Sequence, residues 1–222
     1  MRLFYAETLN PRKACAVARH LQLPVEYVRV DLARQEQRQP GFLAMNPNAK
    51  VPVLQAQGRF IWEANAIMAH LAIVAGSPMW PREPQQQVEL TRWLGWNSEH
   101  FSHYAGTLYF EHLVKPSLGW GDPDPQVVDE AIGYVRQYGA VLDDHLRGRQ
   151  YLLGEQLTIA DFAVAVTLPY AEAARIPLEA FPAVRRWHER LCELPAWLAP
   201  FPPESQSTDW CAAARAEAAA SA

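Results

Sequence analysis

A proline between two valines, Val51-Pro52-Val53, is the feature that most constrains the fold of this chain. It lies in the segment Asn48–Leu54, and a carboxylate, Glu63, follows eleven residues after Pro52. Proline has no N–H and, unlike other residues, adopts a cis peptide bond at small cost. A cis bond before Pro52 would turn the backbone of Val51 outward, so that its N–H and C=O can pair with an extended ligand as an added strand would. The segment therefore predicts a cradle for a peptide-like ligand.

Short strands and helices alternate through the first third of the chain. Asn10-Pro11 has the form of a helix start, with asparagine as N-cap and proline at the first helical position. The expected elements are, in order, a strand at 3–5, a helix from Asn10 up to Pro24, a strand within 25–32, a short helix at 41–45, a hairpin around Gly58 and a helix over 63–74. This order is that of an α/β thioredoxin-like domain.

The rest of the chain is expected to be helical. A proline-rich segment at 77–86 predicts a linker, because prolines spaced so closely cannot continue a helix. Thr158-Ile159-Ala160-Asp161 has the form of a capping box, so a structural role is expected for Asp161. The predicted division is a thioredoxin-like domain at 1–76, the linker, an all-α domain at 87–200 and a tail at 201–222 that is expected to be partly disordered.

Composition excludes several classes of protein. The chain has 222 residues, half of them hydrophobic, and a formal net charge of −4, which argues against a nucleic-acid binder. It has no apolar run of the roughly 20 residues that a membrane span needs and no signal-peptide pattern at its start. Its three cysteines, Cys15, Cys192 and Cys211, are too few and too far apart for a disulfide framework or a zinc site. A cytoplasmic protein without a membrane partner is expected.

Three separated motifs together resemble the cytosolic glutathione transferases. They are the Val51-Pro52 turn, the helix start Glu63-Ala64 and the cap at Thr158 with its flanking residues. The resemblance covers about residues 1–199 and extends to both predicted domains. It implies a glutathione site in the first domain, a hydrophobic co-substrate pocket, and a homodimer with active sites near the subunit interface.

The resemblance also implies which residues activate the glutathione thiol. The thiolate is the nucleophile, and a free thiol is mostly protonated at neutral pH. The segment Thr8–Lys13 is similar to the Thr-x-Asn type of the nu class, in which threonine and asparagine contact the sulfur, so Thr8 and Asn10 are the predicted catalytic residues. The alternatives are a loop residue and a simple N-cap. Tyr5 is a weaker candidate, and Cys15 is expected to be a buried structural cysteine rather than a redox centre.

The two ends of glutathione have their own predicted contacts. Glu63 would bind the γ-glutamyl ammonium, and the backbone N–H groups at the helix start would bind its carboxylate. The family usually has serine at position 64, and Ala64 removes one hydrogen bond. Lys50 would bind the glycine carboxylate, with Val51 and Pro52 holding the middle of the ligand. Gln35 and Arg38 remain open as helpers.

Aromatic and histidine side chains cluster along the segment 93–104. In a transferase this face would line the co-substrate pocket, with Trp96, His100 and Tyr104 as the predicted contacts; core packing is the alternative. A metal site from His100, His103 and His112 is not expected, because no well-placed third ligand accompanies the first pair.

The leading hypothesis is therefore a glutathione transferase that attacks electrophilic substrates. The alternatives are a glutathione-dependent disulfide reductase or peroxidase, a non-catalytic binding module that has lost tight affinity through Ala64, and an isomerase or dehalogenase of small aromatic compounds. Fold alone does not separate these activities.

Overall fold

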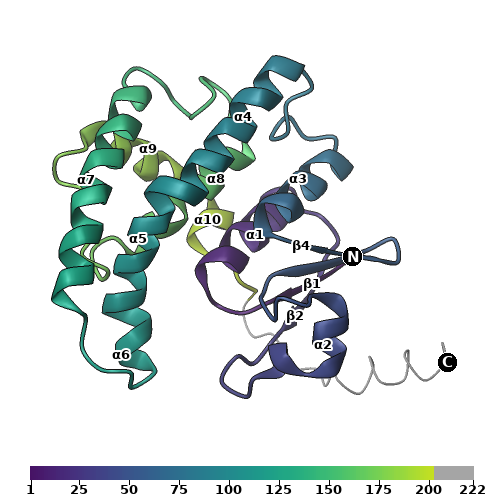
Figure 1. The fold of residues 1–222 in the computed structure, drawn as a ribbon. Helices are drawn as coiled ribbons and strands as arrows, with labels where there is room; N and C mark the ends of the chain where they lie inside the picture. Colours follow the sequence, from purple (N-terminus) through teal and green to yellow (C-terminus); the bar gives the residue numbers. More distant parts are fainter. Residues whose placement is uncertain (203–222) are drawn as a thin grey trace. The chain divides into compact units, whose positions relative to one another are not determined.

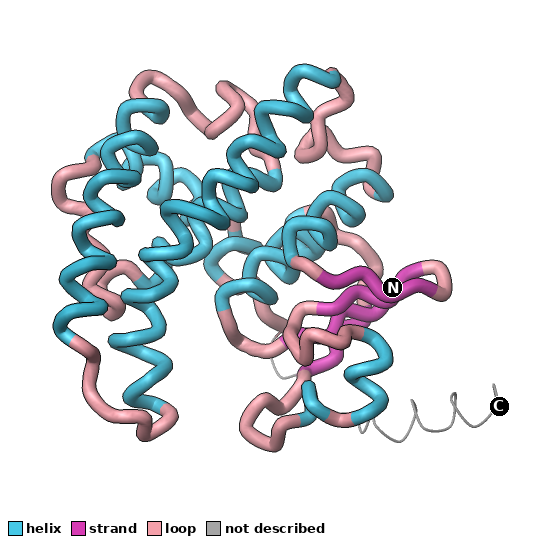
Figure 2. Tube along the Cα trace, in the orientation of Figure 1, coloured by secondary structure: helices cyan, strands magenta, loops and turns pink. Residues whose placement is uncertain are grey.

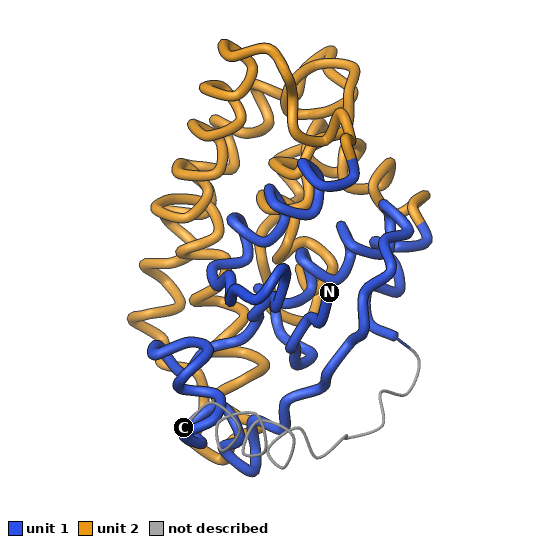
Figure 3. The backbone as a smooth tube through the Cα atoms, turned by 90° about the vertical axis from the view of Figure 1, so that its right-hand side faces the viewer, with its two compact units in different colours: residues 1–75, 195–222 blue, residues 76–194 orange. Residues whose placement is uncertain are grey.

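The computed structural model describes residues 1–202 and divides them into two compact units (Figure 3). The first comprises Met1–Ala75 and the segment from Pro195 onward, and the second comprises Gly76–Leu194. The sequence analysis assigned residues up to 200 to the helical domain, whereas the structure groups 195–202 with the first unit. The expected tail from residue 203 on, with Cys211, lies outside the described residues.

The first unit is built on a mixed sheet with the strand order β2-β1-β3-β4 (Figure 1). Strand β1 (Arg2–Tyr5) pairs in parallel with β2 (Glu26–Arg29) and antiparallel with β3 (Val53–Ala56), and β3 forms a hairpin with β4 (Arg59–Trp62). The helices are α1 (Leu9–His20), the 3₁₀ turn η1 (Glu36–Arg38), α2 (Pro40–Met45), α3 (Ala64–Val74) and α10 (Pro195–Leu198). This arrangement confirms the predicted thioredoxin-like domain.

Helices cover both faces of this sheet. Figure 1 shows α2 on one side and α1 with α3 on the other. On the α2 side, Phe42 and Met45 pack on the strand residues Phe4, Val28 and Val53. Burial of each of these side chains stabilises the folded state by roughly 1.5–3 kcal/mol. This packing holds α2 against the sheet.

The start of α1 differs from the prediction. The predicted N-cap at Asn10 is wrong, because Thr8 has the extended backbone of an N-cap and its carbonyl accepts the first helical bond from Arg12 N at 3.0 Å. Pro11 then occupies the third helical position, where its missing N–H leaves no hydrogen bond unmade. Asn10 therefore lies in the first turn.

The short helix α10 is tied to α1. The buried guanidinium of Arg12 donates to the Trp197 carbonyl at 2.6 Å and lies 5.1 Å from the centre of the Trp197 ring. Four residues later, Phe201 stacks on Tyr5 with ring centres 5.7 Å apart. These contacts explain why the last described segment belongs to the first unit.

The second unit is helical, which confirms the predicted all-α domain, and every strand among residues 1–202 belongs to the first unit (Figure 2). Its elements are α4 (Pro84–Trp96), η2 (Asn97–Phe101), α5 (Ser102–Tyr109), η3 (Phe110–Val114), α6 (Lys115–Ser117), α7 (Pro125–Leu146), α8 (Ile159–Val164), η4 (Ala165–Tyr170) and α9 (Pro182–Cys192). Within residues 1–202, no helix is both long and apolar enough to span a membrane.

The segment from α4 to α6 is a continuous helical run that contains two π-helical segments, η2 and η3. In η2, the buried Asn97 donates to the Ala163 carbonyl at 3.0 Å and accepts from the Ser102 hydroxyl at 2.7 Å. The Asn97 side chain thus links the helical run to α8 at the π-helical segment η2.

Asp161 organises the core of the second unit. Its carboxylate is fully buried and accepts hydrogen bonds from Thr158 N at 2.8 Å, Leu152 N at 2.9 Å and Trp187 Nε1 at 3.0 Å. The predicted capping box between Thr158 and Asp161 is present. Burial raises the pKa of Asp161 to about 6, and the hydrogen bonds act in the opposite direction.

We expect Asp161→Ala to lower the free energy of unfolding by about 3 kcal/mol, because two backbone N–H groups and an indole N–H would lose a buried acceptor. Urea unfolding followed by tryptophan fluorescence measures the change. Glu155→Ala, on an exposed side chain of the same region, is the control. A loss below 1 kcal/mol for Asp161→Ala would contradict the assigned role.

Candidate functional site

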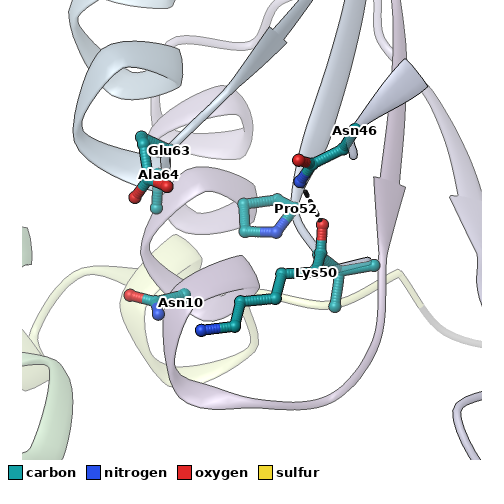
Figure 4. A pocket seen from close by; sticks show the side chains of 7 residues that line it. Asn10, Asn46, Lys50, Pro52, Glu63 and Ala64 are labelled. Carbon is teal, nitrogen blue, oxygen red and sulfur yellow. Dashed lines mark hydrogen bonds between the residues drawn. The ribbon is translucent and has the colours of Figure 1, made fainter. Parts of the chain in front are cut away.

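A small open pocket lies in the first unit (Figure 4). The residues that line it are Asn10, Asn46, Lys50, Val51, Pro52, Glu63 and Ala64. All but Asn46 are predicted site residues, drawn from three separate stretches of the chain. The structure thus brings together the first turn of α1, the turn before β3 and the start of α3.

The turn before β3 presents its backbone to the pocket. The Val51-Pro52 peptide bond is cis. The N–H and C=O of Val51 make no hydrogen bond with any residue in 1–202. This strand-like edge is therefore available to the main chain of a ligand.

Asn46, which the sequence analysis missed, holds this turn in place. Its side chain is 2% exposed, donates to the Lys50 carbonyl at 2.7 Å and accepts from Asn48 N at 3.0 Å. Figure 4 shows the first of these bonds beside Pro52. An asparagine at a helix end before a proline is a signal for such a loop-closing side chain.

Ala49 in the same loop has φ of 54°, in the left-handed region that favours glycine. We expect Ala49→Gly to raise the free energy of unfolding by about 0.5–1 kcal/mol, because the relief of strain exceeds the added entropy of the unfolded chain. Thermal unfolding measures it. Ala140→Gly, in the interior of α7, is expected to destabilise instead, by about 1 kcal/mol. Equal losses in both variants would contradict the assigned strain.

The start of α1 offers hydrogen-bond donors that the protein itself does not use. Thr8 is half-buried, and its hydroxyl makes no hydrogen bond with any described residue. Asn10 is exposed and lines the pocket. No side chain caps α1, so the partial positive charge of its N-terminus faces the same region.

The start of α3 combines a carboxylate with free backbone donors. Glu63, at the N-cap position, is exposed and has φ of 68°, which is unusual for a residue with a side chain. Its carboxylate does not cap the helix, and Ala64 has no polar side chain. Strained backbone of this kind persists where the surroundings enforce it, often at binding sites.

Lys13 lies one helical turn beyond Asn10 and is only 6% exposed. Its Nζ donates to Asn65 Oδ1 at 3.1 Å, which joins α1 to the first turn of α3. Burial lowers the pKa of Lys13 from its ordinary 10.5 to about 8, and Glu63 acts in the opposite direction. The sequence analysis did not single out this residue.

The lowered pKa of Lys13 makes stability depend on pH. Below pH 8 the ammonium is charged in both states and its burial costs about 3 kcal/mol; between pH 8 and 10.5 only the unfolded state is protonated, so the cost disappears. We expect the unfolding free energy of the wild type, relative to that of Lys13→Met, to rise over this interval. Denaturant titrations at pH 7, 9 and 10.5 measure it, and a difference that stays constant with pH would contradict it.

Tyr5 and Cys15 lie outside the pocket. Tyr5 is 1% exposed and packs edge-on against Tyr27. Cys15 is fully buried in α1, and burial raises the pKa of its thiol. Such a thiol is a poor nucleophile, which agrees with a structural cysteine.

The predicted co-substrate residues lie together in the second unit. Trp96 contacts His100 at 6.1 Å between ring centres, His100 stacks on Tyr138 at 4.7 Å, and Tyr104 stacks on Tyr134 at 4.2 Å. Each side chain is half-buried between the long helical run and α7. Across residues 1–202, no three His, Cys, Asp or Glu side chains are grouped to hold a metal ion.

Comparisons with known proteins match both units to the same protein family. The family model of the glutathione S-transferase N-terminal domain matches residues 3–73, and that of the glutathione S-transferase C-terminal domain matches residues 125–190. The chain is similar to glutathione S-transferase 3 of Zea mays, with 32% identity over 218 residues that cover 92% of this chain and 97% of the relative.

Two further similarities concern chemistry and fold. The disulfide-bond oxidoreductase YfcG of Escherichia coli is 28% identical over 202 residues, covering 87% of this chain and 91% of that protein. A glutathione transferase from Burkholderia graminis, solved with two glutathione molecules bound per subunit, shares the fold with a TM-score of 0.77 and 24% identity, covering 90% of this chain and 86% of that one.

Proposed function

Because the chain belongs to the glutathione S-transferase family, we propose that the pocket of its first unit binds glutathione and activates the thiol for attack on a second substrate. The protein is a glutathione transferase-like enzyme, and its relatives include transferases and a disulfide-bond oxidoreductase. The observation that carries the proposal is the pocket itself, in which three separate stretches of the chain present groups that match the parts of one tripeptide.

The parts of glutathione have distinct partners in this pocket. The N–H and C=O of Val51 pair with the main chain of the central cysteine, as an added strand would. Glu63 binds the γ-glutamyl ammonium, and the unpaired N–H groups at the start of α3 bind its carboxylate. Lys50 binds the glycine carboxylate.

The ligand thiol then meets the start of α1. The Thr8 hydroxyl donates a hydrogen bond to the sulfur, and the Asn10 amide supports it from the first turn. The helix N-terminus adds partial positive charge. All three favour the thiolate over the thiol, which lowers the pKa of the bound ligand.

In the transfer reaction the thiolate forms a carbon–sulfur bond with an electrophilic carbon, and the electron pair of the broken bond leaves with the displaced group. The similarity to YfcG favours a second candidate, in which the thiolate attacks a disulfide sulfur and expels the other sulfur as a thiolate. Cys15 is buried, so glutathione rather than that cysteine would supply the attacking sulfur.

The co-substrate and the assembly belong to the same proposal. Trp96, His100 and Tyr104 contact a hydrophobic co-substrate through their half-buried rings. The enzyme acts in the cytoplasm on reactive electrophiles, a detoxifying role, and works as a homodimer. The exposed side chains of Phe60 and Trp62 on the edge strand β4 support a contact with a second copy.

The decisive variant is Thr8→Val, which removes the hydroxyl and keeps the shape. We expect the thiol pKa of bound glutathione to rise and turnover at pH 6.5 to fall about 10- to 100-fold, the value of one hydrogen bond to a charged group. Thiolate absorbance against pH and turnover of a model electrophile measure the two effects. Thr8→Ser, which keeps the hydroxyl, is the matched control.

An unchanged thiol pKa in Thr8→Val would remove Thr8 from the mechanism. If calorimetry up to millimolar ligand detects no glutathione binding by the wild-type protein, the proposed enzymatic function is contradicted. The alternative would then be the non-catalytic binding module, for which Ala64 is the supporting feature.

A further inference from the structure

The residue before Thr8 carries a negative charge that the mechanism above does not use. Glu7 lies between β1 and α1, and its side chain is 45% exposed. A carboxylate in this place is unfavourable for the proposed chemistry, because a nearby negative charge raises the pKa of a thiol. The protein's own Cys15 in α1 shows this effect, since burial is the main cause of its raised pKa and Glu7 adds to it against Arg19. The acid beside Thr8 therefore calls for an explanation.

Glu7 is the centre of a tight turn that leads from β1 into α1. Thr8 N donates to the Ala6 carbonyl at 2.8 Å, which closes a three-residue turn around Glu7. Ala6 is buried, so one end of the turn is fixed in the core. At the other end, the Thr8 carbonyl accepts the first helical bond from Arg12 N at 3.0 Å. The conformation of Glu7 thus sets the direction in which the chain enters α1 and the place of the Thr8 hydroxyl.

Arg29 holds the side chain of Glu7 from the neighbouring strand. It is the last residue of β2, paired with Tyr5 at the end of β1, and its Nε donates to Glu7 Oε1 at 2.8 Å. This hydrogen bond raises the pKa of Arg29, while burial acts in the opposite direction. The strand end itself is fixed, since Val30 N donates to the Tyr5 carbonyl at 2.7 Å. The turn around Glu7 is thereby tied to the sheet through its side chain as well as through its backbone.

We propose that Arg29 is a positioning residue for the thiol chemistry at Thr8. Through Glu7 it holds the turn that places the Thr8 hydroxyl, and its charge offsets the negative charge that Glu7 brings to the start of α1. The inference rests on the proposed function, since it concerns residues that act on the glutathione sulfur through Thr8. Both effects favour the thiolate, because a fixed donor needs no reorganisation and a neutral ion pair does not repel the sulfur.

The alternative is an ordinary surface ion pair. Exposed pairs of this kind contribute little to stability, and the loss of such a pair would leave the ligand thiol unaffected. A second acid, Asp31, also attracts the Arg29 guanidinium, but its carboxylate lies 3.8 Å from Arg34 Nε. Arg34 therefore offers a comparison, as an arginine of the same region that pairs with an acid outside the Thr8 turn.

The test follows the thiol pKa of bound glutathione, by thiolate absorbance against pH at low salt, in a set of charge variants. We expect Arg29→Met to raise this pKa by about 0.5 and to lower turnover at pH 6.5 about threefold, the effect of one uncompensated charge near the protein surface. Arg29→Lys, which keeps the charge, should restore most of the wild-type value. Glu7→Gln, which removes the negative charge and keeps an acceptor for the guanidinium, should lower the thiol pKa. Arg34→Met is the matched control and should leave it unchanged.

An unchanged thiol pKa in Arg29→Met, or an equal change in Arg34→Met, would overturn the proposal. A rise in Glu7→Gln as large as that in Arg29→Met would also overturn it, because the loss of a negative charge cannot raise the pKa of a thiol by electrostatics. A wild type that fails to bind glutathione at all would instead overturn the proposed function, so the two failures are distinguishable. If Arg29→Met does not fold, the difference in thiol pKa between Glu7→Gln and wild type serves in its place; it should shrink as salt is added, and a difference independent of salt would contradict the proposal.

Discussion

The antiparallel pairing of β1 with β3 is the constraint on which the pocket depends. Phe4 lies opposite Val53, and Val53 lies opposite Trp62 on β4. Because neighbouring antiparallel strands run in opposite directions, the end of β1, the start of β3 and the end of β4 share one edge of the sheet. Three segments adjoin these residues and therefore meet at this edge: the start of α1, the cis turn and the start of α3.

That geometry explains how much the sequence could predict. Val51-Pro52 and Glu63 carry local signals: a proline before a strand and an acid before a helix. In the structure β3 begins directly after Pro52 and α3 directly after Glu63. The thioredoxin-like order of elements then brings them to the same edge. The prediction of Asn10 as the N-cap was wrong because an Asn-Pro pair can stand either at the start of a helix or within its first turn. Only the hydrogen bond from Arg12 N to the Thr8 carbonyl distinguishes the two positions.

Other features depend on contacts between distant residues and leave little trace in the sequence. Asn46 acts through the carbonyl of Lys50, and an asparagine near a proline is common in loops. Lys13 looks like an ordinary surface lysine until α3 is packed against it. The grouping of residues 195–202 with the first unit follows from the Arg12 contact to Trp197, whose partners are 185 positions apart.

The return of the chain to the first unit has a consequence for biosynthesis. Domains generally fold as they leave the ribosome, amino-terminal part first. Here the helix that carries Thr8 and Asn10 receives its contact from the Trp197 carbonyl only after all of residues 76–194 have been translated. The unit begun first is thus completed last. A nascent chain stalled within the helical unit would have the pocket of the first unit without the contact that anchors α1.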